Sequence, residues 1–177
     1  MTPRSIFDRM LGALRLDEAA YEEIEHDEKA TGEAAFIVVA TSLVSGAVNG
    51  VLTGAGGGFF GALGSFIGWA FYAWVAYIVG VKLFPGPHTR SSWGEIARTL
   101  GYANTARFFI VFEFVPGLVA LTRVVVGLWV LVATIVALRA SLDITTGRAI
   151  WIAIASTFGQ LVIIAVAVTA AVAIIPR

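Results

Sequence analysis

The chain has 177 residues, of which 58% are hydrophobic and only 14% are charged, against roughly 25% charged residues in soluble domains. This composition excludes an ordinary soluble domain and predicts a membrane domain of about four to six spans, because each crossing needs about 20 apolar residues. The net charge is zero and cysteine is absent, so disulfides and thiolate metal sites are excluded.

Residues 1–33 are predicted to form a cytoplasmic N-terminal segment. They hold nine acidic and four basic side chains, net −5, which argues against nucleic acid as a partner because nucleic acid requires a basic surface. Ser5, followed three residues later by Asp8, predicts a helix start, and apolar side chains then recur at helical spacing over residues 6–14. We expect an amphipathic helix that either lies in the lipid headgroup layer or docks on the protein's own loops.

A second, acidic helical piece follows, with Tyr21 and Ile24 as its apolar side chains. His26 lies one turn after Glu22, a spacing that fits a pair of metal ligands. Two ligands of mixed type on an exposed helix are nevertheless more typical of a solvated face than of a metal site. The sequence therefore predicts no metal and no cofactor.

The remaining residues, 34–177, are predicted to form an all-α, polytopic membrane domain of five transmembrane helices. The predicted spans are residues 34–53, 58–81, 102–115, 118–138 and 149–175. The third and fourth spans are divided at Pro116 and Gly117, because one helix over residues 101–138 would be about 57 Å long, nearly twice the ~30 Å hydrocarbon core.

The basic residues predict the orientation of this domain. In the five-span arrangement, ten of the twelve Lys and Arg residues fall on or near the side of the N-terminus, and only Arg123 and Arg177 fall on the other. Cytoplasmic loops carry an excess of Lys and Arg. We therefore expect a cytoplasmic N-terminus and a C-terminus on the opposite side.

Glycines recur at helical spacing in the first two predicted spans and suggest a packing surface. Helices in lipid associate through close backbone contact at small side chains, whereas so much glycine would weaken a helix in water by about 1 kcal/mol per residue relative to alanine. The predicted helix-packing residues are Gly46, Gly50, Gly54, Gly57, Gly61, Gly64 and Gly68.

Three ionisable residues, Arg107, Glu113 and Arg123, are placed at membrane depth, with Asn49 and Gln160 as polar companions. Charge at this depth is costly and usually paired. Glu113 and Arg123 flank the predicted turn and can meet across it, either as a structural clasp or as part of an ion pathway. Arg107 and Glu113 are six residues apart, roughly 240° around an α-helix, and are not expected to face each other.

Three stretches and the span count carry a resemblance to a known family. The stretches are IFDRMLGALRLDEAAYEEIEHD, VKLFPGPHTRSSWGEIARTLGYANTA and GLWVLVATIVALRASLDITTGRA, and the most specific residues are Leu100, Gly101, Tyr102 and Ala103. The sequence resembles the bacterial branch of the Yip family, the Ypt/Rab-interacting membrane proteins. The resemblance implies five helices, a cytoplasmic N-terminus, the bacterial inner membrane, and a role in membrane organisation or protein partnering.

The sequence favours a non-enzymatic scaffold, adaptor or accessory subunit of a membrane protein complex. A Ser-His-acid trio is not available, because His26 and His88 are the only histidines and both lie outside the spans. Other integral membrane proteins and lipids are the expected partners, and a homo-oligomer is left open. Two alternatives are a small transporter or channel that uses Glu113 and Arg123, and a membrane-shaping protein.

Overall fold

The computed structural model describes residues 4–53, 58–87 and 89–174, and within them the chain is helical, with no strand. The predicted all-α class is confirmed. In chain order the helices are α1 (Ile6–Leu14), α2 (Glu18–His26), α3 (Ala30–Thr53), α4 (Gly58–Tyr77), the π-helix η1 (Ile78–Leu83), α5 (Trp93–Ala103), the 3₁₀-helix η2 (Asn104–Phe114), α6 (Val119–Leu142) and α7 (Thr146–Ile174).

Two helix starts follow directly from local sequence. Ser5 accepts from the backbone N–H of Asp8 at 3.2 Å, and the Asp8 carboxylate in turn accepts from the Ser5 backbone N–H, also at 3.2 Å. Ser92 and Glu95 form the same reciprocal capping box at the start of α5. Each box satisfies backbone donors that a helix N-terminus otherwise leaves unpaired.

Four described helices are long and apolar enough to cross a membrane: Ala30–Leu52, Leu63–Leu83, Val119–Leu142 and Thr146–Val166. They overlap the first, second, fourth and fifth predicted spans. The third predicted span, residues 102–115, is instead the end of α5 followed by η2. At about 2.0 Å per residue, the eleven residues of η2 cover about 22 Å, less than the ~30 Å hydrocarbon core. The predicted count of five spans is therefore not confirmed.

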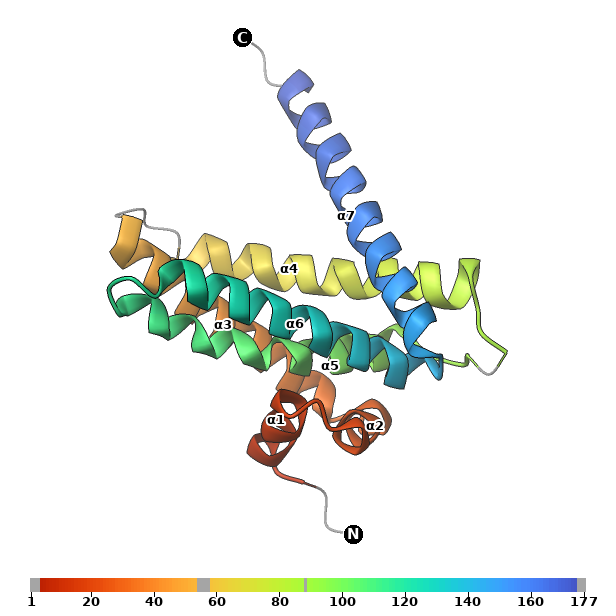
Figure 1. Ribbon diagram of the computed structural model, residues 1–177. Helices are drawn as coiled ribbons and strands as arrows, with labels where there is room; N and C mark the ends of the chain where they lie inside the picture. The colour runs from red at the N-terminus through yellow and green to blue at the C-terminus, as the bar shows by residue number, and fades with distance from the viewer. Residues whose placement is uncertain (1–3, 54–57, 88, 175–177) are drawn as a thin grey trace.

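The chain does turn between η2 and α6, where Pro116 and Gly117 stand. Gly117 has a φ of +86°, a left-handed conformation that glycine adopts at no steric cost. The turn returns the chain so that η2 and α6 lie side by side, with α3 along η2 (Figure 1).

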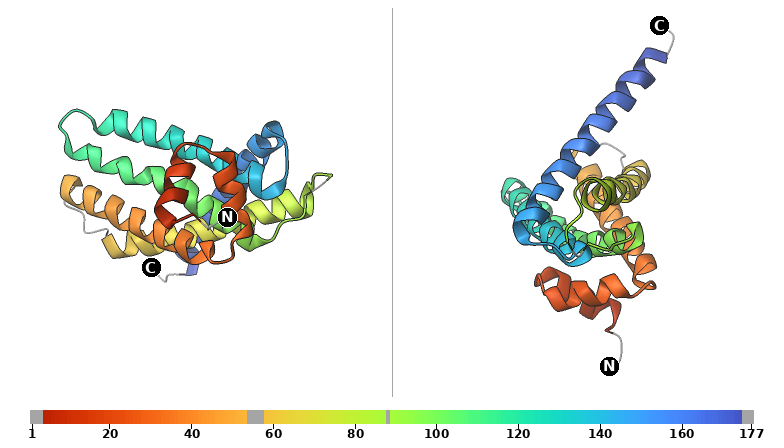
Figure 2. Two further views of the ribbon diagram at one scale, coloured as in Figure 1. Left: turned by 90° about the horizontal axis from the view of Figure 1, so that it is seen from below. Right: turned by 90° about the vertical axis from the view of Figure 1, so that its right-hand side faces the viewer.

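The helices α1 and α2, residues 6–26, form a unit that we call the head. The head packs on α5 and α6 at one side of the bundle, and the C-terminal half of α7 projects from the opposite side (Figures 1 and 2). Tyr21 and Ile24 are fully buried in the shared core, together with Ile96 of α5. The head is therefore docked on the rest of the protein.

The docked face of α1 differs from the one that the apolar spacing predicts. Its buried residues are Arg9, Gly12 and Ala13, whereas Phe7 and Leu11 are exposed. Arg9, which is charged, is only 2% exposed. The physical reason is a set of acidic partners on α2 and α3, which the spacing of α1 alone does not reveal.

Candidate functional site

The Leu100–Ala103 motif lies where the head, α3 and α5 meet. Gly101 faces Ala34 so closely that a Cβ on Gly101 would lie 2.5 Å from the Ala34 Cβ and 3.1 Å from its Cα. Tyr102 is fully buried, and its hydroxyl donates a hydrogen bond to Glu33 at the start of α3. Leu100 and Ala103 are also buried. Glycine lets α5 approach α3, and tyrosine then reaches the acidic residue beside that contact.

Beside this motif, the buried Arg9 is the centre of a cluster of ion pairs with three partly exposed carboxylates. Its guanidinium donates to Glu23 at 3.1 Å, to Asp27 at 2.6 Å and to Glu33 at 3.1 Å. Burial by itself lowers the pKa of Arg9, but the hydrogen bonds that Arg9 donates to Asp27, Glu23 and Glu33 outweigh it and raise the pKa above its usual value. Hydrogen bonding to Arg9 lowers the pKa of Asp27. One cation thus joins α1, α2 and α3.

Arg98 of α5 also holds the head, through hydrogen bonds to the backbone of α2. Its Nε donates to the backbone carbonyl oxygens of Ile24 at 3.0 Å and Glu25 at 2.7 Å, near the C-terminal end of α2. The last carbonyl groups of a helix lack partners within the helix and attract cations. Sequence reasoning missed this role, although Arg98 lies four residues before Tyr102 and so on the same face of α5.

At the far end of η2, Glu113 and Arg123 meet across the turn. The Nε and one terminal nitrogen of Arg123 donate to the two Glu113 carboxylate oxygens, both at 3.0 Å, and Asn49 of α3 accepts from Arg123 at 3.4 Å. Glu113 is buried, whereas half of the Arg123 side chain remains accessible. The geometry is the two-bond fork by which arginine holds carboxylates, and it ties η2, α6 and α3 together.

The expectation that Arg107 and Glu113 do not face each other stays a prediction. It assumed an α-helix, whereas η2 is a 3₁₀-helix with about three residues per turn. Residues three apart therefore lie in one row, which places Asn104 and Arg107 on the same face. Arg107 is exposed, whereas Glu113 is buried against Arg123. The neighbouring row shows the same alignment, since the rings of Phe109 and Phe112 are stacked 6.1 Å apart.

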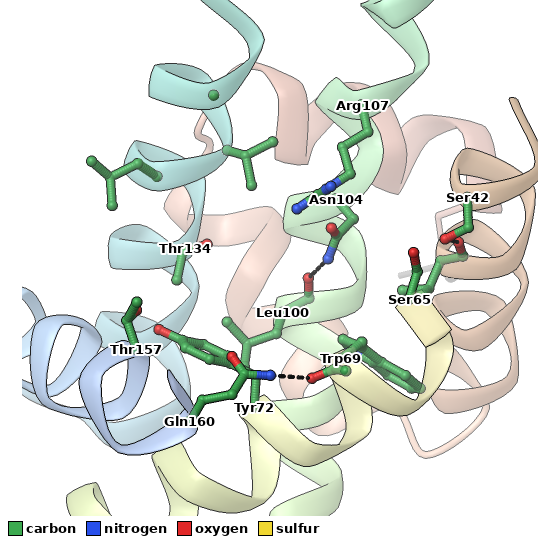
Figure 3. A pocket seen from close by; sticks show the side chains of 15 residues that line it. Ser42, Ser65, Trp69, Tyr72, Leu100, Asn104, Arg107, Thr134, Thr157 and Gln160 are labelled. Atoms are coloured by element: carbon green, nitrogen blue, oxygen red, sulfur yellow. Dashed lines mark hydrogen bonds between the residues drawn. The ribbon is translucent and has the colours of Figure 1, made fainter. Parts of the chain in front are cut away.

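A cavity of about 440 Å³ lies between the helices beside this row, and both Asn104 and Arg107 line it (Figure 3). Gln160 of α7 also lines it and donates to the backbone carbonyl of Gly68 at 3.0 Å. The lining residues come from α3, α4, α5, η2, α6 and α7: Val38, Ser42, Ser65, Gly68, Trp69, Tyr72, Leu100, Asn104, Arg107, Gly127, Val130, Leu131, Thr134, Thr157 and Gln160.

Comparison with protein families identifies the chain. The family model of the Yip1 domain matches residues 12–169, a range that includes most of the head, the motif at residues 100–103 and the cavity. The chain belongs to the Yip1 domain family. Neither the comparison with curated proteins nor that with solved structures gives a match.

Membership in the Yip1 domain family confirms the resemblance to the Yip family, while the bacterial branch stays a prediction. Together with the four apolar helices, it makes the chain an integral, multi-pass membrane protein. The family is one of non-enzymatic membrane proteins that typically interact with other membrane proteins.

The glycines predicted to form a packing surface in this Yip1 domain protein occupy different surroundings. Gly46 and Gly50 are partly buried on α3, which packs against α4. On α4, Gly68 faces Gln160, whereas Gly64 is exposed with no atom within 4 Å of where a Cβ would lie.

Of the other three predicted packing glycines, Gly61 lies within α4, and Gly54 and Gly57 lie outside the described residues. The role of the seven glycines stays a prediction. Close approach is clearest at Gly12, which sequence reasoning missed, and at Gly101; a Cβ on Gly12 would lie 2.5 Å from the Ala20 Cβ.

The suggested pair of metal ligands also lies in the head of this family member. Glu22 and His26 are joined by Glu25, and one ligand atom from each lies within 4.8 Å of the others. His26 Nδ1 is already 2.7 Å from the Glu22 backbone oxygen. Exposed acidic groups commonly gather in this way without an ion, and the absence of a metal site stays a prediction.

Proposed function

We propose that this Yip1 domain protein is a non-enzymatic adaptor that binds a transmembrane helix of another integral membrane protein. The observation that carries this proposal is an apolar groove of about 590 Å³ between α1, η2 and α6. Its walls include Leu11 from the head, Phe109 and Phe112 from η2, and Leu121 and Trp129 from α6. The groove runs from the head into the membrane domain, as a helix leaving the bilayer would require.

The helix α6 has the largest free surface among the four apolar helices. Only 11% of its most apolar stretch is buried within the protein, compared with 22–33% for the other three. Leu121 is 59% exposed and Val125 is 50% exposed, and both line the groove. A helix packed there would cover aromatic and aliphatic side chains without burying a charge, which suits association in lipid by close packing.

The head supports an adaptor more than a membrane-shaping protein. The buried Arg9 and Arg98 hold α1 and α2 on the bundle, so α1 is fixed in place with the exposed Leu11 at the wall of the groove. A helix that shapes membranes must be free to insert its apolar face into the headgroup layer.

A transporter that uses Glu113 and Arg123 has less support. Both carboxylate oxygens of Glu113 are bound to Arg123, which suits a clasp between η2 and α6 rather than a group that exchanges ions.

The orientation and the number of crossings belong to the same proposal. We infer a cytoplasmic head in the bacterial inner membrane, with α5 and η2 together, residues 93–114, as the third of five crossings. Support comes from the antiparallel course of η2 and α6 and from the ten basic residues assigned to the head side. The C-terminus then lies on the opposite side.

Site-specific crosslinking tests whether a partner helix occupies the groove. The chain has no native cysteine, so in a single-cysteine variant only the introduced residue reacts. Leu121→Cys and Val125→Cys, treated in membranes with a thiol-reactive photocrosslinker, are expected to give one discrete adduct with a second membrane protein. Ile154→Cys is the matched control, because Ile154 is similarly exposed, at 54%, on α7 and away from the groove.

Mass spectrometry of the adduct names the partner. An adduct with a second copy of this chain would show that the groove is the interface of a homo-oligomer and not the binding site of an adaptor. Equal adducts from all three positions, or lipid adducts alone, would contradict the proposal.

A further inference from the structure

Arg107 differs from Arg9, Arg98 and Arg123: it is an exposed residue that lines the central cavity. Arg9 has three carboxylates, Arg98 has backbone carbonyls and Arg123 has Glu113. Within the described ranges, no carboxylate, carbonyl or hydroxyl accepts a hydrogen bond from the Arg107 guanidinium, and no acidic group pairs with it. Its side chain extends beside Asn104 toward the central cavity (Figure 3).

An unpaired guanidinium beside a cavity of a membrane domain requires an explanation. Transfer of an uncompensated charge out of water is costly, and charged residues inside membrane domains nearly always find a partner or a water-filled cavity. Arginine stays protonated in proteins, so it cannot avoid this cost by losing its proton. An anion or water that enters the cavity can therefore serve as the partner of Arg107.

The cavity has the character of a ligand site. Its volume of about 440 Å³ falls within the range of roughly 300–1,000 Å³ for small-molecule pockets, which combine an apolar lining with a few convergent polar groups. Leu100, Val130 and Leu131 supply apolar wall, and the hydroxyl groups of Ser65 and Thr134 are among the polar groups that line it.

Hydrogen bonds between helices fix the walls of this cavity. Trp69 Nε1 donates to the Ala97 carbonyl at 2.9 Å, and the Tyr72 hydroxyl donates to the Ala153 carbonyl at 3.3 Å. With the bond from Gln160 to Gly68, these contacts join α4 to α5 and α7. Several donor groups in the cavity walls are thus already hydrogen-bonded to backbone carbonyls. The guanidinium of Arg107 is not, so it can bind a ligand.

We propose that the cavity binds a phosphate group through Arg107. The planar guanidinium matches a phosphate with two parallel hydrogen bonds. A phosphate reaches this site either as the headgroup of an anionic phospholipid or as a free ion. Arg107 is the charge partner, and Asn104, one turn earlier in the same row of η2, is a neutral companion.

Thermal unfolding of the delipidated full-length protein in mixed micelles tests the proposal and distinguishes the two sources. Phosphatidylglycerol, inorganic phosphate and diacylglycerol, which lacks a phosphate, are added separately. We expect a rise of about 5 °C in the unfolding midpoint with phosphatidylglycerol alone if the source is a lipid. The same rise with inorganic phosphate identifies a free ion. Diacylglycerol leaves the midpoint unchanged in both cases.

Three variants at the cavity and one control variant outside it assign the effect to the cavity. Arg107→Gln is expected to weaken binding at least about tenfold, and Arg107→Lys to restore part of it because the charge is kept. Gly127→Leu fills the cavity without touching the arginine, since no atom lies within 4 Å of the position of a Gly127 Cβ, and is expected to abolish the shift even where Arg107→Gln fails to fold. Arg90→Gln, at an exposed residue outside the cavity, keeps the full shift.

The proposal is overturned if neither phosphate source raises the midpoint of the wild-type protein. It is equally overturned if diacylglycerol acts as well as phosphatidylglycerol, or if Gly127→Leu responds like the wild-type protein, because the lipid would then act on the outer surface. None of these results bears on the groove at α6, which the crosslinking experiment tests separately.

Discussion

The hydroxyl of Tyr102 and the guanidinium of Arg9 bind the same carboxylate, that of Glu33 at the start of α3. Through this shared acceptor, a residue of the family motif on α5 is joined to the buried cation of the head. Gly101, next to Tyr102, allows the approach of α3 on which this contact depends. The motif is therefore a structural junction between the head and the membrane helices.

Tyr102→Phe removes the hydroxyl group while it keeps the ring. We expect a loss of about 1–2 kcal/mol, since hydrogen bonds to charged groups contribute more than neutral ones, and a drop of about 5 °C in the unfolding midpoint in detergent. Tyr77→Phe is the control, because the Tyr77 ring contacts Lys82 and its hydroxyl has no hydrogen bond among the described residues. Equal midpoints for both variants would show that the Glu33 contact is dispensable.

Gly101→Ala places a methyl group against Ala34, whose Cβ and Cα would lie 2.5 and 3.1 Å away. Overpacking of this kind typically costs about 1–3 kcal/mol. Gly32→Ala on α3 has open space and should be neutral or stabilising, because alanine is the better helix former. Adding Ala34→Gly to Gly101→Ala should recover part of the loss. Thermal unfolding of the wild-type protein and these three variants measures the differences. If the double variant recovers nothing, the strain lies elsewhere.

Because the pKa of Glu25 is raised in the folded protein, we predict that the protein becomes less stable as the pH rises toward neutrality. Burial raises the pKa of Glu25 from 4.5 to about 7, the positive charge of His26 opposes this rise, and Glu22, Asp143 and Glu95 add to it. The folded protein therefore holds this proton more tightly than the unfolded chain, so the stabilisation is complete below about pH 4.5 and is lost as the pH rises to about 7.

The size of this loss is at most about 3 kcal/mol, at about 1.4 kcal/mol per pKa unit. A backbone hydrogen bond with Glu22 raises the pKa of His26, which contributes with the same sign and is lost as the pH passes that raised value. Glu25→Gln mimics the protonated side chain and should flatten the profile of unfolding midpoint against pH between about 5 and 8. Identical profiles for wild type and variant would remove Glu25 as the cause.

Substitutions at Glu113 and Arg123 should have strongly non-additive effects on the stability of the protein. Arg123→Gln leaves the Glu113 carboxylate buried without its partner, and we expect the unfolding midpoint to fall by about 5–10 °C. Glu113→Gln should cost less, because half of the Arg123 side chain is accessible and can be hydrated. In a double-mutant cycle the double variant should resemble Glu113→Gln alone. Additive losses would show that the two groups act independently.

Local sequence was enough to predict several features of the fold. The apolar stretches predict four of the helices that can cross a membrane, and Ser5 and Ser92 predict the starts of α1 and α5. The turn at Pro116 and Gly117 is equally local. Hydrophobic periodicity and capping depend on residues within a few positions of each other, so no tertiary contact is needed to recognise them.

Only the tertiary structure decided which charges are buried and what they bind. The partners of Arg9 lie 14 to 24 residues away along the chain, and those of Arg98 lie 73 and 74 residues away. The 3₁₀ form of η2, which aligns Arg107 with Asn104 along the cavity, likewise follows from packing between α3 and α6. Residue spacing fixes which side chains share a face, but the fold decides whether that face meets a carboxylate, a carbonyl or a cavity, because electrostatic partners are chosen by proximity in space.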